Sequence, residues 1–367
     1  MSVYMNVLAE TRNFSVTSLS GAVSAFFVTG GIAGIGVARL LERVDVRWIL
    51  IAGALISGVA LSLVGVVESI SLLYLLFVLF GIGNTGVSIV VSTTLVTRWF
   101  PGSNRSVALS VASTGLSMGG ILITPASAWL FEQFGVGVAM PGFGLLFAAA
   151  IILVTLLLIR DAPSAHAVRT AAEISGDWSY PDAVRTRFFV LLTAGYVLCM
   201  ASQVGGIAHL YNHADNQAGF LVAATAVQAL TAMSILSRIV GGFILTRIPI
   251  RWFTLGNLTG QASGLALLAS ADSRGEILVA AGLFGATVGN LLMLHPLWLA
   301  DAYGIGAYAR LFSVSNAWTV LGVAAGPLAM GMLYDFADYR VAYAVAVALS
   351  LGAGLLVAGA GARPMRA

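Results

Sequence analysis

The sequence predicts an all-α polytopic membrane protein, and two observations support this prediction. The chain has 367 residues, of which 59% are hydrophobic and only 9% are charged, whereas roughly 25% of the residues in soluble proteins are charged. Eleven runs of sequence contain no charged residue, and each is long enough to cross a bilayer, which takes about 20 residues. The alternation of apolar and polar residues that marks the strands of a transmembrane β-barrel is not seen.

The charge-free runs are spread over the whole chain and are separated by charged loops. They cover Asn13–Ala38, Trp48–Val67, Ser69–Thr97, Ser106–Phe131, Gln133–Ile159, Phe188–Ala214, Asn216–Ser237, Trp252–Ala271, Ile277–Ala300, Leu311–Tyr334 and Val341–Ala362. Several contain glycine and proline, which membrane helices tolerate better than soluble helices do. Each run predicts one membrane-spanning helix.

The distribution of basic residues predicts the orientation in the membrane. All eighteen basic residues are arginine. If the loops alternate between the two sides, fourteen arginines fall in one set of loops, and Arg12, Arg274 and Arg340 fall in the other. Because cytoplasmic loops carry the excess of basic residues, we expect a multi-pass protein of the inner (cytoplasmic) membrane with a cytoplasmic C-terminus. These loop arginines explain the net charge of +3 without a nucleic-acid partner.

One short motif occurs twice. RVDVRW at Arg43–Trp48 is nearly repeated by RIPIRW at Arg247–Trp252, 204 residues later. Leu79–Gly81 recurs as Leu283–Gly285 at the same offset. The runs and loops between these motifs keep the same order and nearly the same lengths. The chain is therefore predicted to contain two homologous halves, as in transporters built from parallel repeats.

The repeat predicts six helices in each half, with one helix largely absent. We assign residues 1–160 to an N-terminal transmembrane half, 161–186 to a cytoplasmic central loop and 187–367 to a C-terminal transmembrane half. The partner of the run that opens the second half would lie at about residues −16 to 6 on the 204-residue offset. We therefore expect about eleven full spans, with most of the first helix missing. A misplaced start codon or a truncated gene would produce this.

Several stretches resemble motifs of one transporter family. They are Glu42–Arg47, Arg98–Ala108, Asp182–Phe189, Ala208–Leu210, Ser237–Gly242 and Gly322–Pro327. In order and spacing they resemble the major facilitator superfamily, and within it the monocarboxylate-porter and oxalate–formate-antiporter branch. The first stretch departs from that family's D-R-x-G-x-R motif, because Glu42 replaces the first Asp and Asp45 replaces Gly. The resemblance implies a major facilitator fold and secondary transport by alternating access.

Arg238 is the main candidate for binding substrate. It lies nine residues before Arg247, roughly 13.5 Å along a helix, and so near the middle of a hydrocarbon core about 30 Å thick. No carboxylate lies deep in any run, so the guanidinium is suited to a carboxylate that the substrate brings. In the resembled family the arginine at this place binds substrate carboxylate. The alternative is an arginine that snorkels to the interface or bonds helix carbonyls.

Five polar residues inside the predicted membrane segments are further candidates. Tyr196 and Asn290 are near mid-depth and could donate hydrogen bonds to the substrate or bond between helices. Asn84 and Gln203 lie in the outer half and could line the path. His295 could carry a coupling proton or could bond a carbonyl freed by the following proline.

The loop residues Glu42, Arg43 and Arg47 are candidates for a conformational gate. They resemble the family's loop that locks the outward-facing state, and plain cytoplasmic anchoring is the alternative. Oxalate-type members of the family carry a second cation, a lysine, in the segment that corresponds to Phe312–Thr319, and this chain has none there. One deep cation favours a monocarboxylate.

The sequence thus predicts a transporter of a small organic anion, with a proton as a candidate coupling ion. Exporting another organic solute or drug, with Arg238 as a structural residue, is one alternative; a truncated remnant without transport is another. The sequence has no HExxH motif and no nucleotide-binding GxxxxGK[ST] motif, so we expect neither an enzyme nor an ATP-driven pump. We expect no cofactor and no metal. The expected partners are the organic anion and the lipid bilayer, and we expect a monomer.

Overall fold

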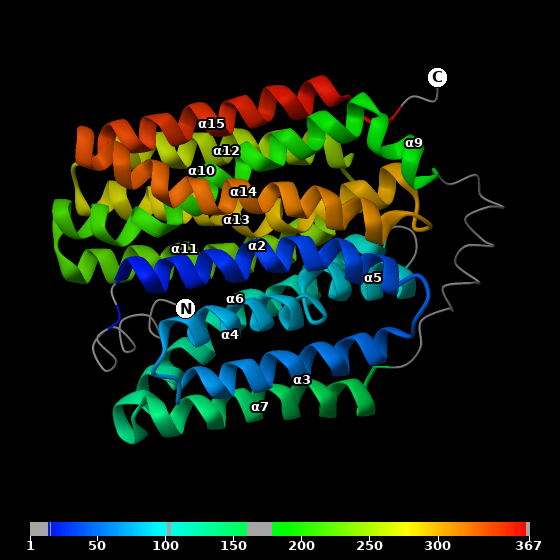
Figure 1. Cartoon of the computed structure of the whole chain (residues 1–367). Helices are drawn as coiled ribbons and strands as arrows, with labels where there is room; N and C mark the ends of the chain where they lie inside the picture. The colour runs from blue at the N-terminus through cyan, green and yellow to red at the C-terminus, as the bar shows by residue number, and fades with distance from the viewer. Residues whose placement is uncertain (1–13, 15, 101–103, 160–177, 365–367) are drawn as a thin grey trace. The chain divides into compact units, whose positions relative to one another are not determined.

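The computed structural model describes residues 14, 16–100, 104–159 and 178–364. Within these residues it contains thirteen α-helices and no strand (Figure 1). The expected remnant of a first helix, at Met1–Asn6, lies outside the described residues, and so does most of the expected central loop. The all-α prediction is confirmed for the described part of the chain.

The helices follow the charge-free runs of the sequence. Those in the first part of the chain are α2 (Val16–Leu40), α3 (Val46–Val64), α4 (Ile70–Thr85), α5 (Ile89–Trp99), α6 (Asn104–Phe134) and α7 (Val136–Leu157). Those in the second part are α9 (Tyr180–Arg185), α10 (Arg187–Ala218), α11 (Phe220–Ile244), α12 (Ile250–Ser270), α13 (Arg274–Tyr303), α14 (Tyr308–Phe336) and α15 (Tyr339–Ala360).

Hydropathy supports a membrane location. In the described part of the chain, nine helical segments are long and apolar enough to cross a membrane. The helices α6 and α12 are not among these nine. In α12, Asn257 and Gln261 are buried polar residues that lower the mean hydropathy of the helix. Long apolar side chains such as Leu153 and Leu157 of α7 are 58% and 67% exposed, which suits contact with lipid and not with water.

One predicted span contains a break that the sequence did not predict. The run Ser69–Thr97 corresponds to a single candidate span, Ile70–Trp99, but within it α4 ends at Thr85 and α5 begins at Ile89. The break coincides with a close approach of two backbones: a Cβ atom on Gly53 would lie 2.8 Å from the Cα atom of Gly86. The amide of Gly86 donates a hydrogen bond to the carbonyl of Gly83, three residues earlier, at 2.9 Å. The last turn of α4 therefore has the tighter geometry of a 3₁₀-helix.

The helices repeat at the offset seen in the sequence. Four pairs of helices, α2/α11, α3/α12, α4/α13 and α6/α14, each begin 204 residues apart, at Val16/Phe220, Val46/Ile250, Ile70/Arg274 and Asn104/Tyr308. The packing repeats as well: α2 packs on α4 as α11 packs on α13, and α3 packs on α7 as α12 packs on α15. The described helices therefore behave as a duplicated set.

The described residues form two compact units, each with its own hydrophobic core. One comprises the residues up to 99 and from 118 onward to the end of α7, and its core includes Phe26 and Phe77. The other comprises the start of α6, residues 104–117, together with α9 to α15, and its core includes Leu265 and Phe284. The start of α6 thus contributes to the unit that contains Arg238.

Candidate substrate site

Arg238 is buried on α11, with only 2% of its surface exposed. Its Nε atom donates a hydrogen bond to the carbonyl oxygen of Gly289 on α13 at 3.1 Å. Its Nη1 atom donates to the carbonyl oxygen of Ser113 on α6. The backbone carbonyl of Arg238 accepts a hydrogen bond from the Ser110 hydroxyl. The guanidinium is therefore held by backbone carbonyls of two neighbouring helices, which is one of the two readings that the sequence left open.

These bonds fix the guanidinium, but its charge has no counterion among the residues that the structure describes. Within the described residues no ion pair joins Arg238 to a carboxylate. Placing an arginine in the middle of a membrane costs at least about 2.5–3.5 kcal/mol on insertion scales, and carbonyl dipoles offset only part of that cost. An anion bound beside the guanidinium would offset the rest.

Gly289 makes the contact between α11 and α13 so close that no side chain would fit. A Cβ atom built on Gly289 would lie 2.2 Å from the carbonyl oxygen of Ser234 and 3.1 Å from Nε of Arg238. Only glycine lets the α13 backbone approach α11 in this way. Gly289 could not be predicted as a site residue from the sequence, because one glycine among 42 gives no signal by itself.

Asn290 lies next to Gly289 and contacts two helices. Its Nδ2 atom donates to Oδ1 of Asn257 on α12 at 3.0 Å and to the carbonyl of Ala286 at 3.2 Å. Its Oδ1 atom is buried without a hydrogen-bond partner in the described part of the chain. This oxygen packs against Gly241 of α11, where an added Cβ atom would lie only 2.1 Å from it. Asn290 is thus bonded to Asn257, a residue that was not predicted from the sequence as part of the site.

Tyr196 and His295 are in direct contact. Their rings stack with centroids 4.2 Å apart and an angle of 13° between the planes. Nε2 of His295 pairs with the hydroxyl of Ser315 on α14 at 2.7 Å, and that hydroxyl pairs with the hydroxyl of Thr193 on α10 at 2.8 Å. His295 is therefore bonded to a side chain through Nε2. The hydroxyl of Tyr196 is buried and has no hydrogen-bond partner among the described residues.

The remaining predicted membrane residues are not joined to either cluster by a hydrogen bond within the described residues. Gln203 is buried on α10, and its Oε1 atom has no partner in that part of the chain. Asn84 is half-buried near the end of α4 and belongs to the other compact unit. Their assignment to the transport path stays a prediction.

The loop between α2 and α3 carries the predicted gate residues. Arg43 is exposed, and Glu42 is half-buried. Nε of Arg47 donates to the carbonyl of Ile159 at 2.8 Å, just after the end of α7. In the same unit, Nη2 of Arg98 donates to the carbonyl of Leu41 at 2.8 Å. The loop is thus bonded to helix ends of its own unit, and its role as a gate stays a prediction.

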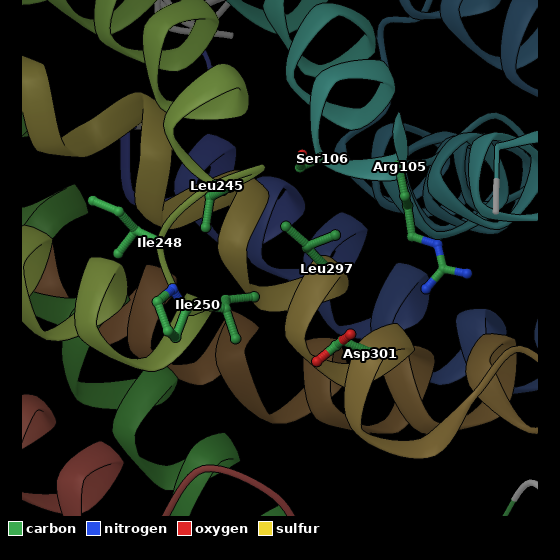
Figure 2. A pocket seen from close by; sticks show the side chains of 8 residues that line it. Arg105, Ser106, Leu245, Ile248, Ile250, Leu297 and Asp301 are labelled. Atoms are coloured by element: carbon green, nitrogen blue, oxygen red, sulfur yellow. The ribbon is translucent and has the colours of Figure 1, made fainter. Parts of the chain in front are cut away.

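A separate pocket of about 370 Å³ opens where α11 turns into α12. Its lining consists of Arg105, Ser106, Leu245, Ile248, Pro249, Ile250, Leu297 and Asp301. Figure 2 shows Ile248 and Ile250 on one side of Leu297, and the charged side chains of Arg105 and Asp301 on the other. None of the predicted site residues lines this pocket, which lies at the ends of the helices.

Comparison with known proteins identifies the family. The family model of the Major Facilitator Superfamily matches residues 1–212, more than half of the chain. A probable nitrate/nitrite transporter of Mycobacterium tuberculosis is 27% identical over 369 residues, which cover 94% of this chain and 87% of that protein. The oxalate:formate antiporter of Oxalobacter formigenes is 25% identical, covering 84% of this chain and 74% of that protein.

A solved structure agrees with the fold. The fucose:proton symporter of Escherichia coli superposes with a TM-score of 0.74 at 15% identity, over 98% of this chain and 96% of that chain. At this level of identity the likeness shows the fold alone. With the family model and the duplicated membrane helices, it establishes that the chain is a multi-pass membrane transporter, not an enzyme, and that it belongs to the Major Facilitator Superfamily.

Proposed function

We propose that this chain is a secondary transporter that moves a small monovalent anion, specifically a monocarboxylate, across the cytoplasmic membrane by alternating access. In this proposal the halves 1–160 and 187–367 expose the site to the two sides in turn, and the C-terminus is cytoplasmic. One observation carries the proposal: the buried guanidinium of Arg238 has no carboxylate partner in the described residues. An anion that arrives as substrate would balance that charge.

The relatives support an anionic substrate. One is named as a nitrate/nitrite transporter and another as an oxalate:formate antiporter. Nitrate and formate are both planar ions with one negative charge, so one guanidinium can bind either through two oxygens. Oxalate has two negative charges, and Arg238 supplies only one positive charge. This balance favours formate-like monocarboxylates over dicarboxylates and makes nitrate the main competing substrate.

We further propose that His295 carries a coupling proton. Its imidazole, the Ser315 hydroxyl and the Thr193 hydroxyl form a chain of hydrogen bonds from α13 through α14 to α10. Each of these groups can both donate and accept, so the chain can pass a proton in either direction. In a proteoliposome with an imposed pH gradient, His295→Gln should abolish gradient-driven accumulation and leave exchange of anions intact. Gradient-driven accumulation at the unmodified rate would contradict this role.

The proposed substrate is tested by flux into proteoliposomes that contain the purified chain. We would measure uptake of labelled formate and acetate, with unlabelled nitrate as competitor, for the unmodified protein and for Arg238→Ala. The expected result is uptake that Arg238→Ala lowers at least about a hundredfold, because a charged hydrogen bond inside the membrane is lost with the charge itself. Arg247→Ala, nine residues away in the loop after α11, is the matched control and should retain uptake.

Each outcome separates one reading from another. If the protein moves carboxylate and Arg238→Ala does not, the monocarboxylate proposal stands. If the protein moves nitrate in preference to carboxylate and depends on Arg238, the anion site stands and the carboxylate assignment is wrong. If Arg238→Ala transports normally, Arg238 is structural and the proposed site is wrong.

A further inference from the structure

The polar residues around Arg238 have no polar counterpart in the first repeat. At an offset of 204 residues, Arg238 corresponds to Gly34. The bonded pair Asn257 and Asn290 corresponds to Gly53 and Gly86, at the same offset. All three polar positions of the second repeat are thus glycine in the first. The helices of the first repeat pack without any of these side chains, so packing of the fold does not require them.

The two repeats space their helices differently at this level. In the first repeat, a Cβ atom on Gly53 would lie 2.8 Å from the Cα atom of Gly86, so the backbones of α3 and α4 touch. In the second repeat, two asparagine side chains fit between α12 and α13 and bond at 3.0 Å. The equivalent helices α12 and α13 are therefore farther apart here than α3 and α4.

On the side of α13 that faces α11, the second repeat is instead more tightly packed than the first repeat is between α4 and α2. Gly289 corresponds to Thr85, whose side chain fits against α2 and donates to the carbonyl of Gly30 at 3.2 Å. At Gly289 a single Cβ atom would already lie 2.2 Å from the carbonyl of Ser234 on α11. At the level of Gly289 and Asn290, α13 is thus farther from α12 and closer to α11 than α4 is from α3 and α2 at the equivalent residues. The close side is where the carbonyl of Gly289 accepts the hydrogen bond from Arg238.

We propose that Asn257 is a positioning residue for the anion site: with Asn290 it forms a spacer that holds α13 against α11, so that the Gly289 carbonyl fixes the direction of the Arg238 guanidinium. This inference rests on the proposed function of Arg238. Asn290 transmits the effect because it is bonded to Asn257 on one side and lies against Gly241 of α11 on the other. Asn257 itself reaches no described atom of Arg238 through a hydrogen bond.

The test converts the spacer into the arrangement that the chain already uses in its first repeat. The double variant Asn257→Gly/Asn290→Gly should let α12 and α13 close on one another and withdraw the Gly289 carbonyl from Arg238. The KM for labelled formate, or for labelled nitrate if that ion is preferred, should rise about tenfold or more, and discrimination between formate and nitrate should fall. Asn257→Ala should change the KM in the same direction, and it decides the test if the double variant does not fold.

Glycine also lowers the stability of a helix, so the control variant must introduce two glycines into the same two helices. Ala266→Gly/Val279→Gly places two glycines at exposed positions of α12 and α13 and should leave the KM unchanged per folded molecule. If Asn257 and Asn290 contributed only to stability, both double variants would yield less folded protein. The KM would then be unchanged in both. A KM unchanged in Asn257→Ala and in the folded double variant would overturn the proposal.

A distance measurement makes the test independent of transport. Spin labels at exposed positions Thr259 of α12 and Leu283 of α13, on a Cys199→Ala background, report the spacing of the two helices. The expected result is a shorter distance in Asn257→Gly/Asn290→Gly, and an unchanged distance would reject the spacer. If Arg238→Ala transports normally while the distance shortens, the proposed function fails and the spacer remains. If Arg238→Ala loses transport while the asparagine variants keep the KM and the helix distance of the unmodified protein, the proposed function stands and only the spacer proposal fails.

Discussion

Arg47 and Arg251 make the same kind of bond in the two repeats. Nε of Arg47 donates to the carbonyl of Ile159 at 2.8 Å, and Nη2 of Arg251 donates to the carbonyl of Ala358 at 3.1 Å. Each arginine is the second residue of its helix, and each acceptor lies at the carboxyl end of a helix in the same compact unit, α7 or α15. Carboxyl ends of helices carry unpaired carbonyls and partial negative charge. The duplicated motif therefore joins two helices within each compact unit.

Removing either arginine should lower stability by a similar amount. We expect Arg47→Ala and Arg251→Ala each to cost at least about 1 kcal/mol, because each loses a charged hydrogen bond to a helix carboxyl end at a partly exposed site. Thermal unfolding of the purified protein in detergent measures the loss, with Arg43→Ala at an exposed position as the control. If Arg47→Ala instead changed the transport rate at unchanged stability, the gate reading of this loop would hold in place of the anchoring one.

Gly289→Ala should be strongly destabilising for a change of one methyl group. The added Cβ atom would meet the carbonyl of Ser234 at 2.2 Å, and overpacking of this kind costs about 1–3 kcal/mol. Gly282→Ala on the same helix is a matched control, because its nearest neighbour would be Cγ of Met233 at 3.8 Å. The control should be neutral or slightly stabilising, since alanine favours helix over glycine. Equal unfolding temperatures for the two variants would contradict the close approach of α11 and α13.

Ser315→Ala should cost more than Ser313→Ala, although both remove a buried hydroxyl from α14. The Ser315 hydroxyl bonds both His295 and Thr193, and leaving such buried partners unsatisfied costs about 1–3 kcal/mol. The Ser313 hydroxyl has no partner in the described part of the chain, so its removal should be close to neutral. Chemical denaturation of the two variants compares them directly. A larger loss for Ser313→Ala would mean that the network on His295 is not formed.

Arg238→Lys should retain the charge but lose its direction. Lysine presents a compact ammonium group in place of a planar fork, so it cannot bond the carbonyls of both Gly289 and Ser113 in the arginine geometry. We expect transport efficiency, measured as kcat/KM for the preferred anion, to fall about tenfold or more. Full activity in the lysine variant would show that only the charge matters and that its orientation does not.

The sequence predicted the helices well because lipid exposure requires long runs without charge, and such runs are visible in the sequence alone. It did not predict the break at Gly86, which depends on the backbone of Gly53 in another helix. Depth along the helix identified Arg238 and Asn290 as membrane residues but could not identify their contacts.

The hydroxyl network was not predicted for a different reason. Serine and threonine in membrane helices often bond a carbonyl of their own helix, so nothing in the sequence distinguishes Ser315 and Thr193 from the other hydroxyl residues. The offset of 204 residues does carry a signal for Asn257, because it aligns the asparagine pair with Gly53 and Gly86. That signal gains meaning only once the contacts of both pairs are known.

In the proposed transport cycle, the charge of Arg238, which pairs with no carboxylate among the described residues, also determines which step the membrane potential can drive. When no proton is bound at His295, the empty site carries one positive charge, whereas the site that holds a monovalent anion is neutral. A potential of 100 mV acts on one charge with about 2.3 kcal/mol across the full membrane, so it acts on the reorientation of the empty protein and hardly on the loaded one. A negative cell interior pulls the empty site inward and slows its return. Such a carrier exchanges one anion for another faster than it accumulates either, since exchange never requires the empty protein to reorient.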